Sequence, residues 1–295
     1  MSRFLDPAVL STLSSLELVA RTVVDGFIAG LHRSVSFGFS QEFAEYRAYN
    51  EGDELKNIDW NVFARTERLV VKRYQGETNS GVTVLLDASN SMSFKSHAVS
   101  KMDYARYIAA CLGYLCLRRQ RDAAGLLVFD EEVRHYMVPS MRQGQLARLL
   151  AGLELAEPRA RTRFEEPLSQ VDALLRRRGI VVLISDFYEE PQRVIRALEP
   201  LAQRGNEVLL LHLMDPEEMK PLPKGGALLV DLETGERLEV SGEYARDEYG
   251  ARLQKHLTDL AQGAQGAGMH HQLMVTDRPL DQALTEYLTV RGGRG

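Results

Sequence analysis

A short apolar run that ends in a cluster of oxygen-bearing side chains constrains the fold of this chain more than any other feature. Residues 82–86 are almost continuously apolar, which is typical of a strand buried on both faces of a parallel sheet. Asp87, Ser89 and Ser91 follow at once, in the pattern Asp-x-Ser-x-Ser. Because open α/β sheets bind ligands beyond the carboxyl ends of their strands, we expect these side chains to line a binding site.

Strand and helix patterns alternate along the rest of the chain. Further strands are predicted at residues 124–129, 133–138, 180–185, 207–214 and 272–275, and helices at 104–115, 146–153, 167–177, 191–204, 249–260 and 280–290. The tight turn at Asp130-Glu131 joins two of these strands as a hairpin, which predicts one antiparallel edge strand. The pattern predicts an α/β fold with a doubly wound, mostly parallel sheet.

The prediction divides the chain into two main regions. Residues 1–80 hold a helix at 14–29 and a strand-and-turn segment at 42–80, and residues 81–291 form the α/β domain. A β-hairpin is predicted as an insertion at 215–241. The glycine-rich tail, 292–295, is expected to fray.

Composition excludes several classes of protein. The formal charge of −5 gives no electrostatic case for nucleic-acid binding. No apolar run is long enough to span a membrane, and no cleavable signal is recognisable. Cys111 and Cys116, the only cysteines, lie in one helical pattern and are predicted to be packed, reduced thiols. We therefore expect a cytoplasmic protein.

A second carboxylate is predicted to reach the same edge of the sheet. Asp186 ends the apolar strand at 180–185 as Asp87 ends the first, and Thr162 lies in a loop between them. With Ser89 and Ser91 these hard oxygen donors suit Mg²⁺, or Mn²⁺, with part of the coordination through water. The alternatives are structural. Ser91 or Ser93 could cap the helix that follows, Asp186 could cap the helix before Pro191, and Thr162 could be an ordinary loop residue.

Two resemblances rest on these residues and on the segment before them. Asp87, Ser89 and Ser91, with Thr162 and Asp186, resemble the metal-ion-dependent adhesion site of von Willebrand factor A domains. The segment from Glu45 to Arg65 resembles the bacterial family called domain of unknown function 58. The matching positions are Tyr46, Arg47, Gly52, Asp53, Ile58, Asp59, Trp60, Ala64 and Arg65. Asn57 departs from the usual arginine, and Thr162 from the usual Gly-Gly-Thr setting.

These resemblances imply a function. In adhesion sites of this kind, a cation held by Asp87, Ser89, Ser91, Thr162 and Asp186 takes an acidic side chain from a partner protein. Members of the family are commonly encoded beside MoxR-type AAA+ ATPases, which implies such an ATPase and an unknown client as partners. Many relatives have membrane helices before this region, and this chain is expected to be a soluble version.

An enzyme is the competing hypothesis. Mg²⁺-dependent phosphohydrolases of the haloacid dehalogenase type also begin with a strand and an aspartate, but their general acid would stand at Ser89, which cannot protonate a leaving group. No nucleotide-binding loop or nucleophile elbow is present. The preferred hypothesis is a binding module without catalysis. Residues 42–80, with Arg47, Gly52, Asp53, Asp59, Trp60 and Arg65, are either a structural platform or a second contact surface.

Overall fold

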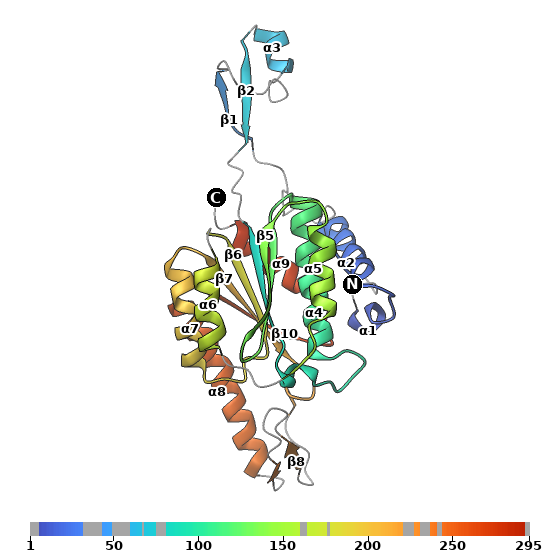
Figure 1. Cartoon of the computed structure of the whole chain (residues 1–295), viewed down its shortest axis with the longest axis vertical. Coiled ribbons are helices and arrows are strands. Elements are labelled where there is room, and N and C mark those ends of the chain that lie inside the picture. Colours follow the sequence, from blue (N-terminus) through green and yellow to red (C-terminus); the bar gives the residue numbers. More distant parts are fainter. Residues whose placement is uncertain are drawn as a thin grey trace. The chain divides into compact units, whose positions relative to one another are not determined.

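The computed structural model of the chain comprises two compact units. One unit contains residues 1–27 and 80–294, and the other contains residues 28–79 (Figure 1). The residues described are 6–31, 43–48, 60–66, 68–74, 81–159, 164–175, 178–220, 227–230, 237–240 and 244–292. The predicted region 1–80 is therefore divided, because most of its first helix belongs to the unit that holds the sheet.

A six-stranded sheet forms the centre of the larger unit. Its strands are β3 (Val82–Asp87), β4 (Ala124–Phe129), β5 (Val133–Ser140), β6 (Ile180–Ser185), β7 (Glu207–Met214) and β10 (His270–Val275). They lie in the order β10-β7-β6-β3-β4-β5, and every pair is parallel except β4 with β5. The α/β fold with one antiparallel edge strand is confirmed.

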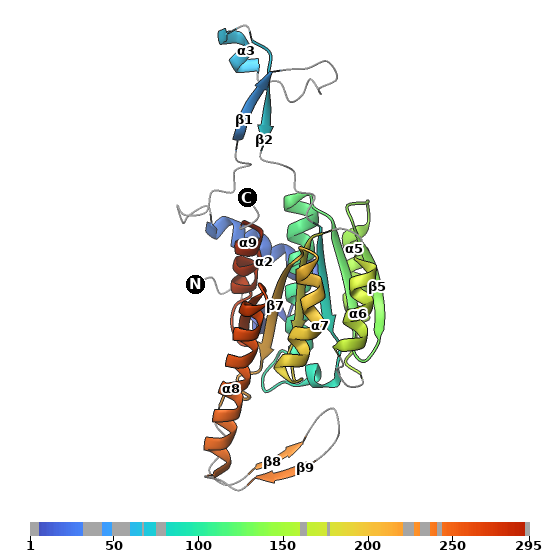
Figure 2. The ribbon, with the colours of Figure 1, turned by 90° about the vertical axis from the view of Figure 1, so that its left-hand side faces the viewer.

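Helices cover both faces of this sheet (Figures 1 and 2). The helices α4 (Lys101–Tyr114), α5 (Gln145–Glu154) and α9 (Asp281–Gly292) lie on one face, and α6 (Glu165–Leu174), α7 (Pro191–Gln203) and α8 (Tyr244–Gly266) lie on the other. With helices on both sides, β3, β4 and β6 are buried along their whole length. This double burial explains their continuous apolar sequences.

The remaining elements are short or peripheral. At the start of the chain lie α1 (Pro7–Leu10), capped by Asp6, and α2 (Leu16–Leu31). The predicted insertion contains the antiparallel hairpin of β8 (Ala227–Val230) and β9 (Arg237–Val240). Two irregular helices flank α4, the 3₁₀-helix η3 (Asn90–Ser93) and the π-helix η4 (Leu115–Gln120). No helix in the described part of the chain is both long and apolar enough to cross a membrane.

The smaller unit contains a strand pair and a helix. Strand β1 (Phe43–Ala48) pairs in antiparallel fashion with β2 (Val70–Tyr74), and α3 (Trp60–Thr66) lies between them in sequence. The strand-and-turn segment predicted at 42–80 contained no helix, so α3 was not predicted.

Two buried features of the larger unit bear on its stability. Strands β3 and β6 begin so close together that a Cβ atom on Gly179 would lie 2.2 Å from the carbonyl oxygen of Gly81. At the other end of the sheet, His212 Nδ1 of β7 lies 3.3 Å from His271 Nε2 of β10. Burial, and then the charge of nearby His256, lower the pKa of His271 to about 4.

The two cysteines are buried and free, as predicted. Cys116 Sγ lies 3.3 Å from the hydroxyl of Tyr287 on α9, and burial raises the pKa of the Cys116 thiol to about 12. Burial also raises the pKa of Cys111. Both thiols therefore act as small apolar groups, and Cys116 packs η4 against α9.

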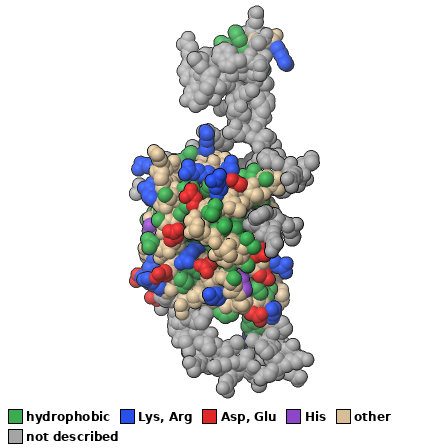
Figure 3. Space-filling view, turned by 90° about the vertical axis from the view of Figure 1, so that its right-hand side faces the viewer, with side chains coloured by type: hydrophobic (Ala, Val, Ile, Leu, Met, Phe, Trp, Pro, Cys, Tyr) green, Lys and Arg blue, Asp and Glu red, His purple; other side chains and the backbone are tan. Residues whose placement is uncertain are grey.

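Basic and acidic side chains both occur on the face of the larger unit shown in Figure 3. Several basic side chains gather near its upper end in that view, and acidic side chains lie among and below them. This mixture accords with the small net charge of the chain, −5.

Candidate metal centre

The two carboxylates predicted from the sequence lie at the same edge of the sheet because their strands are direct neighbours. Strand β3 pairs with β6 in parallel from Val82 with Ile180 to Leu86 with Ile184. The next residues are Asp87, which ends β3, and Ser185, which ends β6 and precedes Asp186. Both aspartate side chains are completely buried.

Asp87 is held by hydrogen bonds on both of its oxygens. Its Oδ1 accepts from the backbone N–H of Ser89 at 2.8 Å, and its Oδ2 accepts from the hydroxyl of Ser185 at 2.5 Å. The hydroxyls of Ser89 and Ser91 lie 3.0 Å apart and are both buried. One carboxylate and two hydroxyls of the Asp-x-Ser-x-Ser loop are therefore packed together at the end of β3.

Asp186 has one satisfied oxygen and one without a partner. Its Oδ2 accepts from Lys101 Nζ at 2.7 Å, whereas Oδ1 is buried and has no hydrogen-bond partner. The Lys101 ammonium, itself fully buried, also donates to Glu218 Oε1 at 2.8 Å and lies 4.5 Å from the ring centre of Tyr188. A buried acceptor without a donor is costly unless another group satisfies it.

The site carries more negative than positive charge. Burial, and then the negative charge of Asp186, raise the pKa of Asp87 to about 7, although hydrogen bonds from Ser185 and Ser89 act to lower it. Burial alone would lower the pKa of Lys101, but Asp186 and Glu218 outweigh it and raise that pKa. The one ammonium pairs with two carboxylates, those of Asp186 and Glu218, and Asp87 adds a third acidic group.

These donors fit a hard divalent cation. Carboxylate and hydroxyl oxygens are the ligands that Mg²⁺ prefers, and the unpartnered Asp186 Oδ1 is an acceptor that a cation would satisfy. Within the described ranges no group of three or more His, Cys, Asp or Glu side chains could hold a metal. The described part of the site therefore rests on two aspartates and two serines, which suits Mg²⁺ better than Zn²⁺.

The helix caps predicted as alternatives for Ser91, Ser93 and Asp186 are not found in the structure. Helix α4 begins at Lys101, and its cap is Ser100, whose hydroxyl accepts from the Asp103 N–H at 3.0 Å. Ser91 and Ser93 lie in the 3₁₀-helix η3 instead. Asp186 caps no helix either, since the N-cap of α7 is Glu190. Thr162 lies outside the described residues.

Three residues of the site were not predicted from the sequence. Ser185 anchors Asp87, Lys101 pairs with Asp186, and Glu218 shares that lysine. Ser185 could have been noticed because it shares the Ile-Ser-Asp end of the strand with Asp186. No local pattern marks Lys101 or Glu218, which approach the site only through the folding of distant segments.

The family-specific residues belong to the smaller unit. Arg47 lies in β1 opposite Val71 of β2, Trp60 is the first residue of α3, and Arg65 is exposed in its last turn. Gly52, Asp53 and Asp59 lie outside the described residues.

A family model described as "Protein of unknown function DUF58" matches residues 45–259, more than half of the chain. The chain belongs to the DUF58 family. A similar relative is an uncharacterized protein of Mycobacterium tuberculosis, 29% identical over 277 residues, which are 92% of this chain and 86% of that protein. An uncharacterized protein of Mycobacterium avium is 34% identical over 112 residues, 37% of this chain and 65% of that protein.

Solved structures similar to this DUF58 protein include von Willebrand factor A domains. The conserved hypothetical protein BatB from Bacteroides thetaiotaomicron is 16% identical, with a TM-score of 0.48 over 71% of this chain and 97% of that one. The von Willebrand factor A domain of SpRpn10 is 10% identical, with a TM-score of 0.41 over 70% of this chain and 94% of that one.

Proposed function

We propose that this DUF58 protein is a non-catalytic interaction module that binds an acidic side chain of a partner protein through Mg²⁺ or Mn²⁺. Asp87, Ser89, Ser91 and Asp186 would hold the cation, with Thr162 as a further donor. The observation that carries the proposal is the buried, unpartnered Oδ1 of Asp186 at the sheet edge where Asp87 and the two serine hydroxyls meet.

The charge of the site supports a divalent cation. Asp87, Asp186 and Glu218 bring three negative charges when ionised, and Lys101 offsets one of them. A cation of charge +2 would balance the remaining two. When bound it supplies a positive centre that keeps exchangeable water, and a carboxylate of a partner can replace that water.

The role of the chain's own residues is to bind and to orient. Strand pairing fixes the two aspartates, Ser185 holds Asp87 through Oδ2, and Lys101 holds Asp186 through Oδ2. Ser89 has no acidic proton to deliver to a leaving group. These residues therefore support docking rather than the hydrolysis of a phosphate ester.

The resemblance stated above supports an adaptor role. We propose that a MoxR-type AAA+ ATPase is the partner, and that the complex acts in the maturation of a protein client. Either the ATPase or the client would present the carboxylate to the cation.

Calorimetric titration of the purified protein with MgCl₂ and MnCl₂ tests the metal centre. Wild type should bind one cation, Asp87→Ala should bind none, and Asp259→Ala should match wild type because Asp259 lies on the surface of α8 and pairs with Lys255. Equal cation binding by wild type and Asp87→Ala would contradict the proposed metal centre.

Affinity capture of the ATPase tests the partner. Because AAA+ ATPases need Mg²⁺ for nucleotide, the comparison is made at constant Mg²⁺ between wild type, Asp87→Ala and Asp259→Ala. Wild type and Asp259→Ala should retain the ATPase or its client, and Asp87→Ala should not. Retention by all three would contradict docking through the metal.

A further inference from the structure

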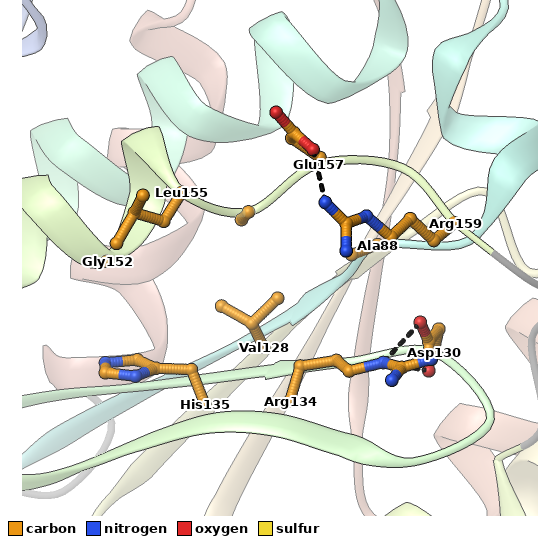
Figure 4. Close-up of a pocket in the computed structure, with 10 residues that line it drawn as sticks. Ala88, Val128, Asp130, Arg134, His135, Gly152, Leu155, Glu157 and Arg159 are labelled. Atoms are coloured by element: carbon orange, nitrogen blue, oxygen red, sulfur yellow. Dashed lines mark hydrogen bonds and ion pairs between the residues drawn. The ribbon is translucent and has the colours of Figure 1, made fainter.

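A cavity of about 220 Å³ lies directly beside the metal-binding loop (Figure 4). Its apolar lining comes from Ala88, Val128, Gly152, Leu155 and Ala156. In Figure 4, Val128 of β4 lies between the end of α5 and the strand β5. The cavity is smaller than the pockets that enclose drug-sized molecules, which are about 300–1,000 Å³. It therefore suits one side chain better than a cofactor or a metabolite.

Ala88 belongs both to the lining of the cavity and to the Asp-x-Ser-x-Ser loop. This residue follows Asp87 directly, and its carbonyl oxygen accepts from the Arg159 N–H at 2.8 Å. Its own N–H donates to the Phe129 carbonyl at 2.7 Å, so the wall is fixed on both sides. A peptide whose carboxylate reaches the metal centre would therefore pass its neighbouring residue over this cavity.

A glycine lets α5 pack closely against β4 and β5 beside the cavity. A Cβ atom on Gly152 would lie 3.0 Å from Leu126 Cδ2 and 3.1 Å from His135 Nε2, tighter than ordinary contact. At the rim, Leu155 ends α5 with 81% of its surface exposed. An exposed leucine beside a hollow of apolar lining offers apolar surface that a partner side chain can cover.

The polar rim bears two arginines with different partners. Arg134 is engaged with Asp130, whose side chain is 1% exposed, so this ion pair belongs to the fold. Arg159 pairs with Glu157 at 2.6 Å, but both side chains are about two-thirds exposed. Such an exposed pair contributes little and is readily exchanged for the carboxylate of a partner.

We propose that this cavity receives a leucine-sized aliphatic side chain of the partner, next to the acidic residue that docks at the metal centre. The inference rests on the proposed function and names its partner more closely: a peptide segment in which an aliphatic residue adjoins Asp or Glu. Arg159 favours a second carboxylate in the same segment.

Fluorescein-labelled octapeptides test the proposal by anisotropy with the full chain in excess Mg²⁺. One peptide contains Gly-Leu-Asp-Gly, a second Gly-Asp-Leu-Gly and a third Gly-Gly-Asp-Gly, each between Gly-Ser flanks. One of the leucine peptides should bind about tenfold more tightly than the glycine peptide, a difference of about 1.4 kcal/mol. Leu155→Ser should abolish this preference and leave binding of the glycine peptide unchanged.

The control variants separate this inference from the proposed function. Met141→Ser removes another exposed apolar side chain, outside the cavity, and should keep the preference. Asp87→Ala should abolish binding of all three peptides. Equal Mg²⁺-dependent binding of leucine and glycine peptides would overturn the cavity assignment alone. Binding that is unchanged by removal of Mg²⁺ and by Asp87→Ala, or no binding by any peptide, would overturn both the cavity assignment and the proposed function.

Discussion

Replacement of the buried Lys101 at the candidate metal centre should strongly destabilise the metal-free protein. Lys101→Met keeps most of the aliphatic stem and removes the ammonium that lies 2.7 Å from Asp186 and 2.8 Å from Glu218. Lys101 and Asp186 are both completely buried, and Glu218 is 11% exposed. The substitution therefore leaves a buried carboxylate without its counter-ion.

The expected loss in the free energy of unfolding follows from these distances. Coulomb's law at an effective dielectric constant of about 20 gives about 6 kcal/mol of attraction for each N···O pair. Desolvation of the ions, several kcal/mol each, offsets much of this attraction. Removal of one partner from a buried pair costs about 3–5 kcal/mol, and we expect Lys101→Met to fall in that range.

Urea denaturation in excess EDTA measures the effect. Far-UV circular dichroism is the appropriate signal, because the only tryptophan, Trp60, lies in the smaller unit and would report on that unit instead. Lys220→Met is the matched control, since Lys220 is exposed and pairs with an exposed glutamate, and its midpoint should not move.

A double-mutant cycle tests whether the destabilisation arises from the unpaired charge of Asp186. If the cost of Lys101→Met arises from the orphaned charge of Asp186, adding Asp186→Asn should recover at least about 1.5 kcal/mol relative to the sum of the single changes. A loss below about 1 kcal/mol for Lys101→Met, or additive effects in the double variant, would refute this explanation.

Three further predictions concern the site and the fold. Ser185→Ala should weaken Mg²⁺ binding by about 10–100-fold in calorimetry while the fold is retained, because the hydrogen bond that orients Asp87 is lost. Because the pKa of His271 is lowered, this residue takes up a proton near pH 6.5 in the unfolded chain but only near pH 4 in the folded chain. The free energy of unfolding should therefore fall as the pH falls from 6.5 to 4. His271→Gln should flatten that dependence in urea titrations at several pH values, whereas His270→Gln should not. Gly179→Ala should lower the free energy of unfolding by about 3 kcal/mol or prevent folding, because the added Cβ would overlap a backbone carbonyl. Gly250→Ala, whose Cβ would lie in open space on α8, should leave the free energy of unfolding unchanged in the same denaturation assay.

The sequence predicted those parts of the site that local pattern determines. Strand β6 was predicted at its observed ends and β3 to within one residue, because burial on both faces requires a continuous apolar run. Each run stops where the chain reaches the edge of the sheet, so Asp87 and Asp186 were placed together before the pairing of the strands was known. The end of each apolar run in the sequence therefore predicts where the carboxylate lies in the fold.

The partners of those carboxylates depend on tertiary structure. Lys101 stands 85 residues from Asp186 and 117 from Glu218 in the chain, and locally it is an ordinary polar residue after a helix cap. A buried lysine has the same sequence signal as an exposed one. The helix at Trp60 was missed for a related reason, since its short, mixed sequence has no clear amphipathic period.

The contacts of the site bear on what kind of metal centre it can be. Strand pairing, the Ser185 hydroxyl and the Lys101 ammonium place Asp87 and Asp186 by interactions among the chain's own groups. A structural metal, in contrast, contributes the folding energy itself, and its site does not persist without it. In the proposed centre these interactions would hold the carboxylates in place, so that exchange of a water for a partner's carboxylate would require little rearrangement of the protein. Preorganisation of this kind limits the entropic cost of docking, which is what a reversible interaction module requires.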